Sequence, residues 1–463
     1  MVRANAPSLR ARLATAASEQ IFFDRTAQVC VTELRCGTSL GGRLAALACR
    51  SVMVATASQL SAALALIELD GVARRLTILP PDTAPEHLSA LIACAEVDTV
   101  VVDVGTPPHA AFDVPLRVLA KPAITAAGDL PPMQAHTEWV LLTSGTSGVP
   151  KMALHNLASL IAPIGAEHRD GVVVWGTFYD IRRYGGLQIF LRALIGEASL
   201  ILSSASEPVA DHLARLGRCD VTHLSGTPSA WRRALMSPAI GKIAPRYVRL
   251  SGEIADQAVL DSLHAAFPQA RVGHAYASTE AGVAFEVEDG RAGFPADILE
   301  RDRDGVVLRL AKGALRIRSP RTAQRYLGAQ AAALRDGDGF VDTGDMVERR
   351  DNRYVFVGRR GGIINVGGLK VHPEEIEAVI NRHPQVRMSL VRPKRNAVTG
   401  AIVIADVVLK AQTAGAGGGE LAIKNDILAL CREALPRHKV PAAISIVLAL
   451  DVAATGKLAR RHG

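Results

Sequence analysis

The chain has 463 residues, too many for one hydrophobic core of ordinary size, and its length predicts two or three domains. Hydrophobic residues make up 49% and charged residues 21%, the balance of a folded globular protein. The formal net charge is +8, but Lys and Arg are spread along the chain, and aromatic residues are only 4%. So few aromatic residues make a base-stacking surface improbable, and we expect no nucleic-acid partner.

Cysteine usage and the N-terminus both indicate a cytoplasmic protein. The six cysteines form no CxxC pair, and no His cluster has metal-ligand spacing, so we expect small buried residues with free thiols. The N-terminus is polar and lacks the apolar region of a secretory signal. Polar side chains interrupt the most apolar stretch, residues 52–69, which predicts a buried helix rather than a membrane span.

In the first half of the chain, β-branched runs alternate with helical segments, which predicts parallel or mixed sheets flanked by helices. The expected elements are a helix at Gln59–Leu69 and strands at Ser51–Thr56, Arg75–Leu79, Val97–Val104, Gly171–Trp175, Ala198–Ser203, Val221–Ser225 and Tyr247–Ser251. After Gly293, short strands with Gly and Asp turns predict a small β-rich subdomain.

The last hundred residues predict a separate small α+β domain. Pro373 stands at the first position of an expected helix, with acidic residues in its first turn. Two strands, Met388–Val391 and Ala401–Val408, and an amphipathic helix, Leu421–Leu435, are expected to follow. We therefore predict an α/β fold with a large core, residues 1–357, and a small mobile C-terminal domain, residues 358–463.

A run rich in Gly, Ser and Thr predicts an anion-binding loop. The run is Thr143, Ser144, Gly145, Thr146, Ser147, Gly148, Val149, Pro150 and Lys151. Glycines let backbone amides approach an anion, hydroxyls add donors, and the lysine adds a positive charge. A Walker loop has four residues between its glycines and then Lys, and Pro150 breaks that spacing. An ordinary surface turn is the alternative.

Six segments, in the same order along the chain, resemble the motifs of the adenylate-forming superfamily. This superfamily includes acyl- and aryl-CoA synthetases, peptide-synthetase adenylation domains and luciferases. The segments are the loop 143–151, Ser251-Gly252-Glu253, Tyr276-Ala277-Ser278-Thr279-Glu280, Thr343-Gly344-Asp345, residues 358–377, and Thr455-Gly456-Lys457. The resemblance spans roughly Trp139 to Arg460.

The resemblance implies an ATP site. In the family the aromatic ring at Tyr276 stacks on adenine, the hydroxyl at Thr279 contacts phosphate, and Glu280 helps to hold Mg²⁺, an ion that prefers a few carboxylate oxygens plus phosphate. Asp345 is expected to accept both ribose hydroxyls, and Arg359 to contact ribose or phosphate. The expected nucleotide set is Thr143, Ser144, Gly145, Thr146, Ser147, Gly148, Lys151, Ser251, Gly252, Glu253, Ala275, Tyr276, Ala277, Thr279, Asp345 and Arg359.

The resemblance also implies a reaction in two halves. The acid attacks the α-phosphorus of ATP, forms an acyl-adenylate and expels pyrophosphate; a thiol of CoA or of a carrier protein's phosphopantetheine then takes the acyl group. The expected catalytic residues are Lys457, which bridges ATP and the acid, together with Thr279, Glu280 and Lys151. In the family the small domain rotates between the halves.

Three glycines near the domain boundary have expected roles. Alignment on Gly358 places the hinge, usually Asp or Lys in the family, at Gly361. Glycine permits rotation there with less restraint on either state. Gly367 and Gly368 leave room for a narrow thiol-bearing arm, or they form only a tight turn.

The expected acyl pocket consists of Tyr179, Arg182, Tyr184, Gly185 and Ser225. A buried Arg182 would select a second anionic or hydroxyl group on the acid. Alternatively, Arg182 pairs with Asp180 or faces solvent. The sequence is compatible with both interpretations.

The predicted function is an AMP-forming acid–thiol ligase, a monomer or homodimer that acts on a small carboxylic acid. One alternative is a stand-alone adenylation enzyme that loads an amino or aryl acid onto a carrier protein in trans. Another is a non-catalytic nucleotide-binding scaffold, against which Lys151, Glu280, Asp345, Arg359 and Lys457 argue together.

Overall fold

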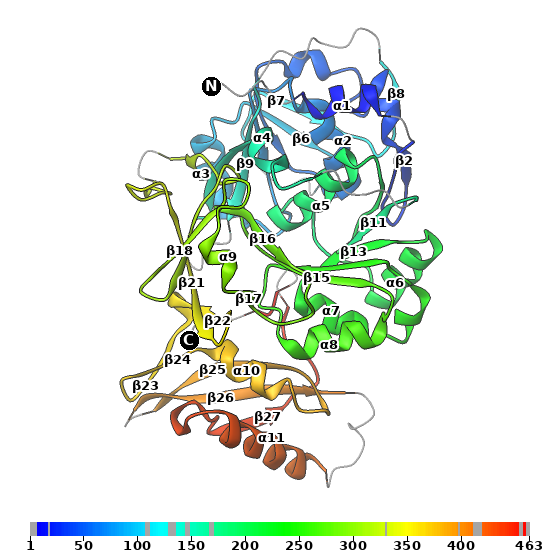
Figure 1. Cartoon of the computed structure of the whole chain (residues 1–463). Coiled ribbons are helices and arrows are strands. Elements are labelled where there is room, and N and C mark those ends of the chain that lie inside the picture. Colours follow the sequence, from blue (N-terminus) through cyan, green and yellow to red (C-terminus); the bar gives the residue numbers. More distant parts are fainter. Residues whose placement is uncertain are drawn as a thin grey trace.

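The computed structural model describes residues 7–16, 19–106, 112–127, 136–143, 149–165, 171–328, 331–396, 399–410, 419–452 and 457–459. The chain forms a large N-terminal domain with a small C-terminal domain packed beneath it (Figure 1). Loop residues 144–148 and tail residues 453–456, which belong to two of the predicted motifs, lie outside the described residues. No helix in the described part of the chain is long and apolar enough to cross a membrane.

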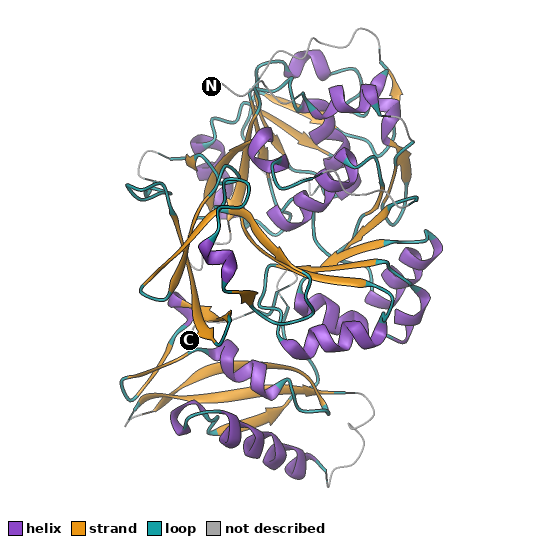
Figure 2. Ribbon diagram, viewed as in Figure 1, coloured by secondary structure: helices purple, strands orange, loops and turns teal. Residues whose placement is uncertain are grey.

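Two sheets form the framework of the large domain (Figure 2). In spatial order, the first contains β16 (Gly282–Val287), β15 (Arg271–Ser278), β14 (Tyr247–Ser251), β13 (His223–Gly226), β11 (Val174–Thr177), β12 (Ser199–Ile201), β1 (Ile21–Phe23) and β2 (Gln28–Cys30). The second contains β20 (Arg325–Tyr326), β10 (Lys151–Asn156), β9 (Glu138–Thr143), β5 (Arg75–Ile78), β4 (Ser51–Val54), β6 (Thr99–Val102) and β7 (Leu116–Leu119). A short pair, β3 (Gly37–Thr38) and β8 (Thr125–Ala126), lies outside both sheets.

The predicted mixed sheets are confirmed. Six central strands of the first sheet run parallel, and the edge strands β16 and β2 are antiparallel. The strand Tyr247–Ser251 and the helix Gln59–Leu69 have the predicted bounds. The strand predicted at Gly171–Trp175 begins three residues later, at Val174, because backbone pairing and not the apolar run sets its limits.

Two helices, α2 (Gln59–Leu69) and α5 (Tyr184–Ile195), pack between the two large sheets. Every residue of α2 is buried, as a helix that is apolar on all sides requires. The Ser58 side chain accepts the backbone N–H groups of Leu60 and Ser61 and so caps the helix start. This central layer places α5 against β11, β12 and β15.

The remaining helices cover the outer faces. α6 (Val209–Arg218), α7 (Pro228–Leu235) and α8 (Gln257–Ala266) cover the first sheet with a second apolar core, and α3 (Leu88–Cys94) packs on the second sheet. The other short helices are α1 (Leu9–Thr15), α4 (Leu157–Ile161) and α9 (Asp297–Glu300). All six cysteines are free thiols, but Cys36 and Cys49 are exposed rather than buried as expected.

The β-rich subdomain predicted after Gly293 is a third sheet. Its strands in spatial order are β17 (Phe294–Pro295), β22 (Arg353–Arg359), β21 (Val341–Arg350), β19 (Ala314–Arg318) and β18 (Val307–Ala311). β22 ends at Arg359, two residues beyond the predicted domain boundary. The division at residues 357 and 358 remains our proposal.

The C-terminal domain is a small α+β unit. It contains a hairpin of β23 (Ile364–Val366) and β24 (Leu369–Val371), a sheet of β25 (Val386–Asn396), β26 (Gly400–Leu409) and β27 (Ala443–Ile446), and the helices α10 (Pro373–Ile380) and α11 (Glu420–Ala434). Pro373 is the first residue of α10, as predicted. These elements bury a core of their own between the sheet and the two helices.

The predicted hinge lies in open space. Gly361 belongs to a single 3-10 turn, Arg360–Gly362, and a Cβ added there would meet no atom within 4 Å. Gly361 and Gly362 also line a cavity of about 640 Å³ between the C-terminal sheet and Ala459. A methyl side chain at Gly361 or Gly362 would therefore meet no described atom, although the role of Gly361 as a hinge is still a prediction.

We expect Gly361→Pro to impair turnover through the hinge. Proline fixes φ and disfavours the helical conformation of the preceding residue, Arg360. The control is Gly361→Ala, whose added methyl group has room. Rates of acyl-adenylate formation and of thiol transfer, measured separately, check the prediction. Wild-type rates for both halves in Gly361→Pro would place the hinge elsewhere.

Candidate active site

The site forms where β14 ends. Gly252 follows Ser251 with φ +85°, a conformation that favours glycine. A Cβ added at Gly252 would lie 3.4 Å from Cε and 4.0 Å from Nζ of Lys457. The lysine from the C-terminal domain therefore reaches the end of a core strand, and a side chain at Gly252 would crowd it.

Lys457 is held by the residue beside it. The backbone N–H of Leu458 donates to Oε1 of Glu253 at 3.0 Å, and Glu253 also accepts from the backbone and hydroxyl of Ser229. Lys457 is exposed to solvent, although groups of the large domain lie close to its side chain. Loss of hydration and the nearby positive charge of Arg359 lower the pKa of Lys457, against the opposing charges of Glu253 and Asp345.

Asp345 connects the third sheet to this site. Its Oδ1 accepts from Nε of Arg359 at 2.8 Å, and its Oδ2 accepts from the hydroxyl of Tyr276. The negative charge of Asp345 raises the pKa of Arg359, whose side chain is otherwise exposed. Each carboxylate oxygen has a second lone pair, so Asp345 can still accept a diol.

The ring of Tyr276 lies among other aromatic rings. Its plane is within 6° of Phe356 and 18° of Phe285, with centroids 5.1 and 5.7 Å away. Tyr276 is half-buried on β15. Its hydroxyl bond to Asp345 joins the predicted adenine platform to the predicted ribose-binding carboxylate.

Lys151, Tyr326 and Glu280 form a second group. Nζ of Lys151 lies 5.2 Å from the centroid of the Tyr326 ring, a cation–π contact. The Tyr326 hydroxyl donates to Oε1 of Glu280 at 3.1 Å. Glu280 also adds to the potential that raises the pKa of Arg359, so this group borders the Asp345 group.

A buried histidine positions Thr279. Nε2 of His155 lies 2.7 Å from the Thr279 carbonyl oxygen, and Nδ1 lies 3.1 Å from Oγ of Ser159. Burial lowers the pKa of His155 to about 4, so the ring is neutral at pH 7. A neutral ring donates one bond and accepts the other, which fixes the backbone of Thr279 against β10.

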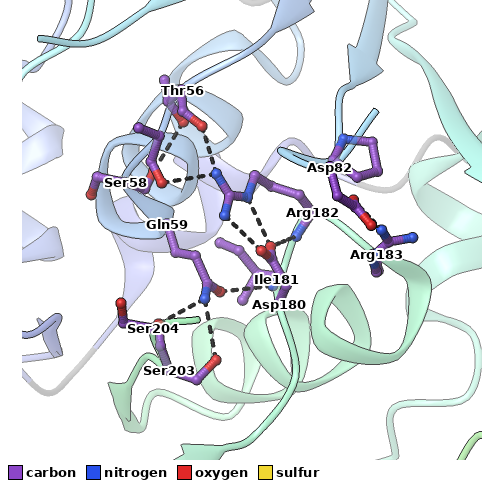
Figure 3. Close-up of polar contacts among 12 residues, drawn as sticks. Thr56, Ser58, Gln59, Asp82, Asp180, Ile181, Arg182, Arg183, Ser203 and Ser204 are labelled. Atoms are coloured by element: carbon purple, nitrogen blue, oxygen red, sulfur yellow. Dashed lines mark hydrogen bonds and ion pairs between the residues drawn. The ribbon is translucent and has the colours of Figure 1, made fainter. Parts of the chain in front are cut away.

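The guanidinium of the predicted pocket residue Arg182 is hydrogen-bonded to other residues of the chain (Figure 3). Nε and Nη2 of Arg182 bond both carboxylate oxygens of Asp180, at 2.8 and 2.6 Å. Its Nη1 donates to the carbonyls of Thr56 and Ala57, at 2.5 and 2.9 Å. The structure therefore agrees with the second interpretation of Arg182, in which it pairs with Asp180. The arginine therefore ties its loop to the second sheet and has little left to offer an acid.

Neighbouring contacts hold the same loop (Figure 3). Gln59 accepts from the backbone of Ile181 at 2.8 Å and donates to the carbonyl of Ser203 at 2.7 Å. Arg183 pairs with Asp82. These bonds fix the approach to α5, whose first residue is Tyr184.

The other predicted acyl-pocket residues lie on one face, between the first sheet and α5. The Tyr179 hydroxyl donates to the Ser251 carbonyl at 2.8 Å, and a Cβ on Gly185 would touch the Tyr179 ring at 3.6 Å. Tyr184 is buried at the start of α5, and Ser225 is fully buried on β13. The structure thus brings Tyr179, Tyr184, Gly185 and Ser225 together beside the end of β14.

Gly367 and Gly368 form the two-residue turn of the β23–β24 hairpin. Their φ values are +56° and +86°, which favour glycine in a tight hairpin turn. The turn alone explains both residues, and a role in passing a thiol arm remains a prediction. No group of three or more metal-binding side chains occurs among the described residues.

Sequence reasoning missed two residues of this site, Tyr326 and His155, and one contact of the predicted Glu253. Tyr326 links Lys151 to Glu280, and His155 fixes Thr279. Glu253, predicted to contact the nucleotide, also anchors the C-terminal tail. A histidine one residue before an Asn cap was a weak signal for His155. The other two contacts join residues far apart in sequence and carry no local pattern.

The sequence model of the AMP-binding enzyme family matches residues 44–327, and that of the AMP-binding enzyme C-terminal domain matches residues 375–457. The chain belongs to the AMP-binding enzyme family. It is 27% identical over 350 residues to a 2-succinylbenzoate–CoA ligase of Geobacillus kaustophilus, covering 70% of this chain and 68% of that protein. It is 26% identical over 360 residues to a benzoate–CoA ligase of Thauera aromatica, covering 70% and 65%.

Solved structures share the fold. An anthranilate CoA ligase in complex with anthranoyl-AMP has a TM-score of 0.79 at 16% identity, covering 98% of this chain and 95% of that one. An o-succinylbenzoate CoA synthetase from Bacillus subtilis, in complex with its acyl-adenylate intermediate, has a TM-score of 0.71 at 18% identity, covering 98% and 97%. The predicted superfamily, fold class and enzyme class, an AMP-forming acid–thiol ligase, are confirmed.

His155 predicts a pH dependence of stability. The ring ionises near pH 6.5 in the unfolded chain and near 4 in the fold. The lowered pKa contributes stability that is complete above pH 6.5 and lost as pH falls toward 4, by about 2 kcal/mol at pH 5. Denaturant unfolding at pH 7.5 and 5 should show a smaller loss for His155→Gln than for wild type.

The exposed histidine of α8 supplies the control, as His264→Gln. An identical pH dependence in wild type and His155→Gln would contradict the neutral buried ring.

Proposed function

We propose that this chain activates an aryl or acyl carboxylic acid with ATP and Mg²⁺ and transfers the acyl group to CoA. One observation carries the proposal: Lys457 lies at Gly252, within the field of Asp345, Arg359 and Glu253, where β14 meets the acyl-pocket residues. The 2-succinylbenzoate and benzoate relatives support an aryl acid, and their names support CoA as the acceptor. A carrier protein in trans is the alternative acceptor.

The first half-reaction brings two anions together, so positive charge has to be held at the point of contact. Lys457 supplies it between the acid carboxylate and the α-phosphate, and Lys151 supplies it toward the outer phosphates. Asp345 binds the ribose hydroxyls and, through Arg359 and Tyr276, holds the nucleotide in one orientation. The backbone of Thr279, fixed by His155, sets the hydroxyl of that residue toward phosphate.

Glu280 fits the part of a Mg²⁺ ligand. Its Oε1 accepts from Tyr326, and no described residue bonds its Oε2. A single carboxylate suits Mg²⁺, which keeps waters and takes its other ligands from phosphates. When bound, the ion would neutralise phosphate charge and orient the triphosphate.

Acid-dependent exchange of pyrophosphate into ATP tests the proposal, with CoA consumption and carrier-protein loading compared afterwards. Exchange with an aryl acid and consumption of CoA are expected. Absence of exchange with every aryl, dicarboxylic and fatty acid would favour a nucleotide-binding scaffold. Loading of a carrier protein without use of CoA would favour the stand-alone adenylation enzyme.

Replacement of Lys457 should separate the two half-reactions. Lys457→Ala removes the charge at the point of attack, so adenylation should fall by at least about 100-fold. Thiol transfer from a supplied acyl-adenylate should stay close to wild type. Lys439→Ala is the control, because Lys439 pairs with Glu375 within the C-terminal domain. An equal loss of rate in both half-reactions of Lys457→Ala would contradict a role of Lys457 specific to adenylation.

Replacement of Asp345 should act on ATP rather than on the acid. Asp345→Ala removes the acceptor for the ribose hydroxyls, and the loss of such a bond corresponds to an increase of about 10- to 100-fold in KM for ATP. KM for the acid should change far less. The control is Asp342→Ala. Asp342 lies on the same strand as Asp345, β21, and its carboxylate forms a surface ion pair with Arg360. An unchanged KM for ATP in Asp345→Ala would argue against ribose binding.

A further inference from the structure

Arg249 stands on β14, two residues before Ser251. Val248 and Leu250 point into the core under α6–α8, so Arg249 and Ser251 face the opposite side, toward α5 and the acyl-pocket residues. Arg249 is only 2% exposed. A buried arginine is rare unless its donors are satisfied, and its position on this face therefore needs an explanation.

The guanidinium of Arg249 is only partly satisfied. Nε donates to Oε1 of Glu286 at 3.2 Å, but Nη2 has no hydrogen-bond partner among the described residues, although it is buried. A buried donor left without an acceptor costs about 1–3 kcal/mol. Such a cost in a native fold calls for an explanation, for which a bound water, ion or ligand is a candidate.

The backbone is built to place this pair. Arg249 is opposite Gly273 on β15, and a Cβ at Gly273 would lie 3.4 Å from Oε1 of Glu286 and 3.0 Å from Cγ of Glu288. Glycine therefore lets Glu286 reach across β15 to Arg249. Glu288 is paired with the exposed Arg271 and does not supply the missing acceptor.

Other donors gather at the same place. Tyr184 is 6% exposed, and its hydroxyl makes no hydrogen bond of normal geometry, although the backbone of Val283 lies close enough to act on it. Burial raises the pKa of Tyr184, so the hydroxyl stays protonated and can donate. The charges of Arg249, Arg321 and Arg192 all act on it.

The distance from the reacting group can be read from the strand. Lys457 lies at Gly252, and Arg249 is three residues earlier, about 10 Å along the strand. The Tyr179 hydroxyl bonds Ser251 on this face, so an acid whose reacting carboxylate meets Lys457 would have to run beside Tyr179 to reach Arg249 and Tyr184. The first pocket arginine, Arg182, is saturated by Asp180 and by backbone carbonyls.

We propose that Arg249, with Tyr184, binds a second carboxylate at the far end of the acid, so that the preferred substrate is a dicarboxylic acid. This inference rests on the proposed acid activation and narrows it to one substrate class. The unmet groups are donors, and one of them is a guanidinium, which matches a carboxylate better than it matches a neutral acceptor.

The test compares matched acids on the wild-type protein. Benzoate, its 4-carboxylate and its 4-carboxamide form one series; hexanoate, hexanedioate and the monoamide of hexanedioate form the other. The assay is ATP-dependent release of pyrophosphate. In one series, kcat/KM should be about 10- to 100-fold higher for the diacid than for the monoacid and the amide, because a charge-assisted buried hydrogen bond contributes in that range.

The decisive variant removes the cation without leaving its partner carboxylate alone. Arg249→Met alone would leave Glu286 buried and unpaired, so Arg249→Met is combined with Glu286→Gln. In the double variant, the preference for the diacid should disappear because KM for the diacid rises. The monoacid should be turned over as well as before or better. The control is the double variant Arg353→Met with Asp289→Asn, which removes an ion pair between the third sheet and the loop after β16; it should keep the preference.

Two failures have different meanings. Equal or better turnover of the monoacid or amide by wild type, or an unchanged preference in the double variant, would overturn the second-carboxylate site and leave acid activation standing. A bound water satisfying Arg249 would give the first of these results. No pyrophosphate release with any acid would overturn the proposed function itself.

Discussion

The carboxylate of Glu253 is the contact on which the geometry of the site depends. It accepts from the backbone and hydroxyl of Ser229 at the start of α7, and from the backbone of Leu458 in the C-terminal tail. A charged acceptor with three donors is worth more than a neutral one. Because Lys457 is the residue before Leu458, this anchor decides that its ammonium lies at Gly252. The bond joins residues 205 positions apart and so records the closure of the small domain on the large one.

β14 has an apolar face toward the outer helices and a polar face toward the acyl-pocket residues. Val248 and Leu250 are core residues under the outer helices, whereas Arg249 and Ser251 face the space against α5. The strands beside it run parallel, so their ends meet at one edge, and loops after those ends carry Gly252 and Glu280. One strand can therefore supply the reacting end of a pocket at Gly252 and its far end at Arg249, with a fixed spacing between them.

Much of the fold could be predicted because local patterns agreed with the tertiary structure. The helix Gln59–Leu69 is capped by Ser58 and apolar on all sides, and the strand Tyr247–Ser251 is bounded by Pro245 and Gly252. β25 is longer than predicted because pairing with β26 extends it through Pro393 into polar residues that carry no strand signal. The motif residues of the site were found by resemblance, but Tyr326 and His155, which contact two of them, were not.

Two arginines show where sequence reasoning ends. Arg182 lies in the segment expected to contact the acid, yet its donors are taken by Asp180, two residues away, and by carbonyls about 125 residues away. Arg249 lies in a strand that reads as ordinary core, yet it retains a buried donor. Whether an arginine is available depends on how many of its five donors the fold has used, and that count requires contacts between distant parts of the chain. Substrate selection therefore belongs to the residue whose hydrogen bonds the folded chain leaves incomplete, not to the one whose position in a motif is most suggestive.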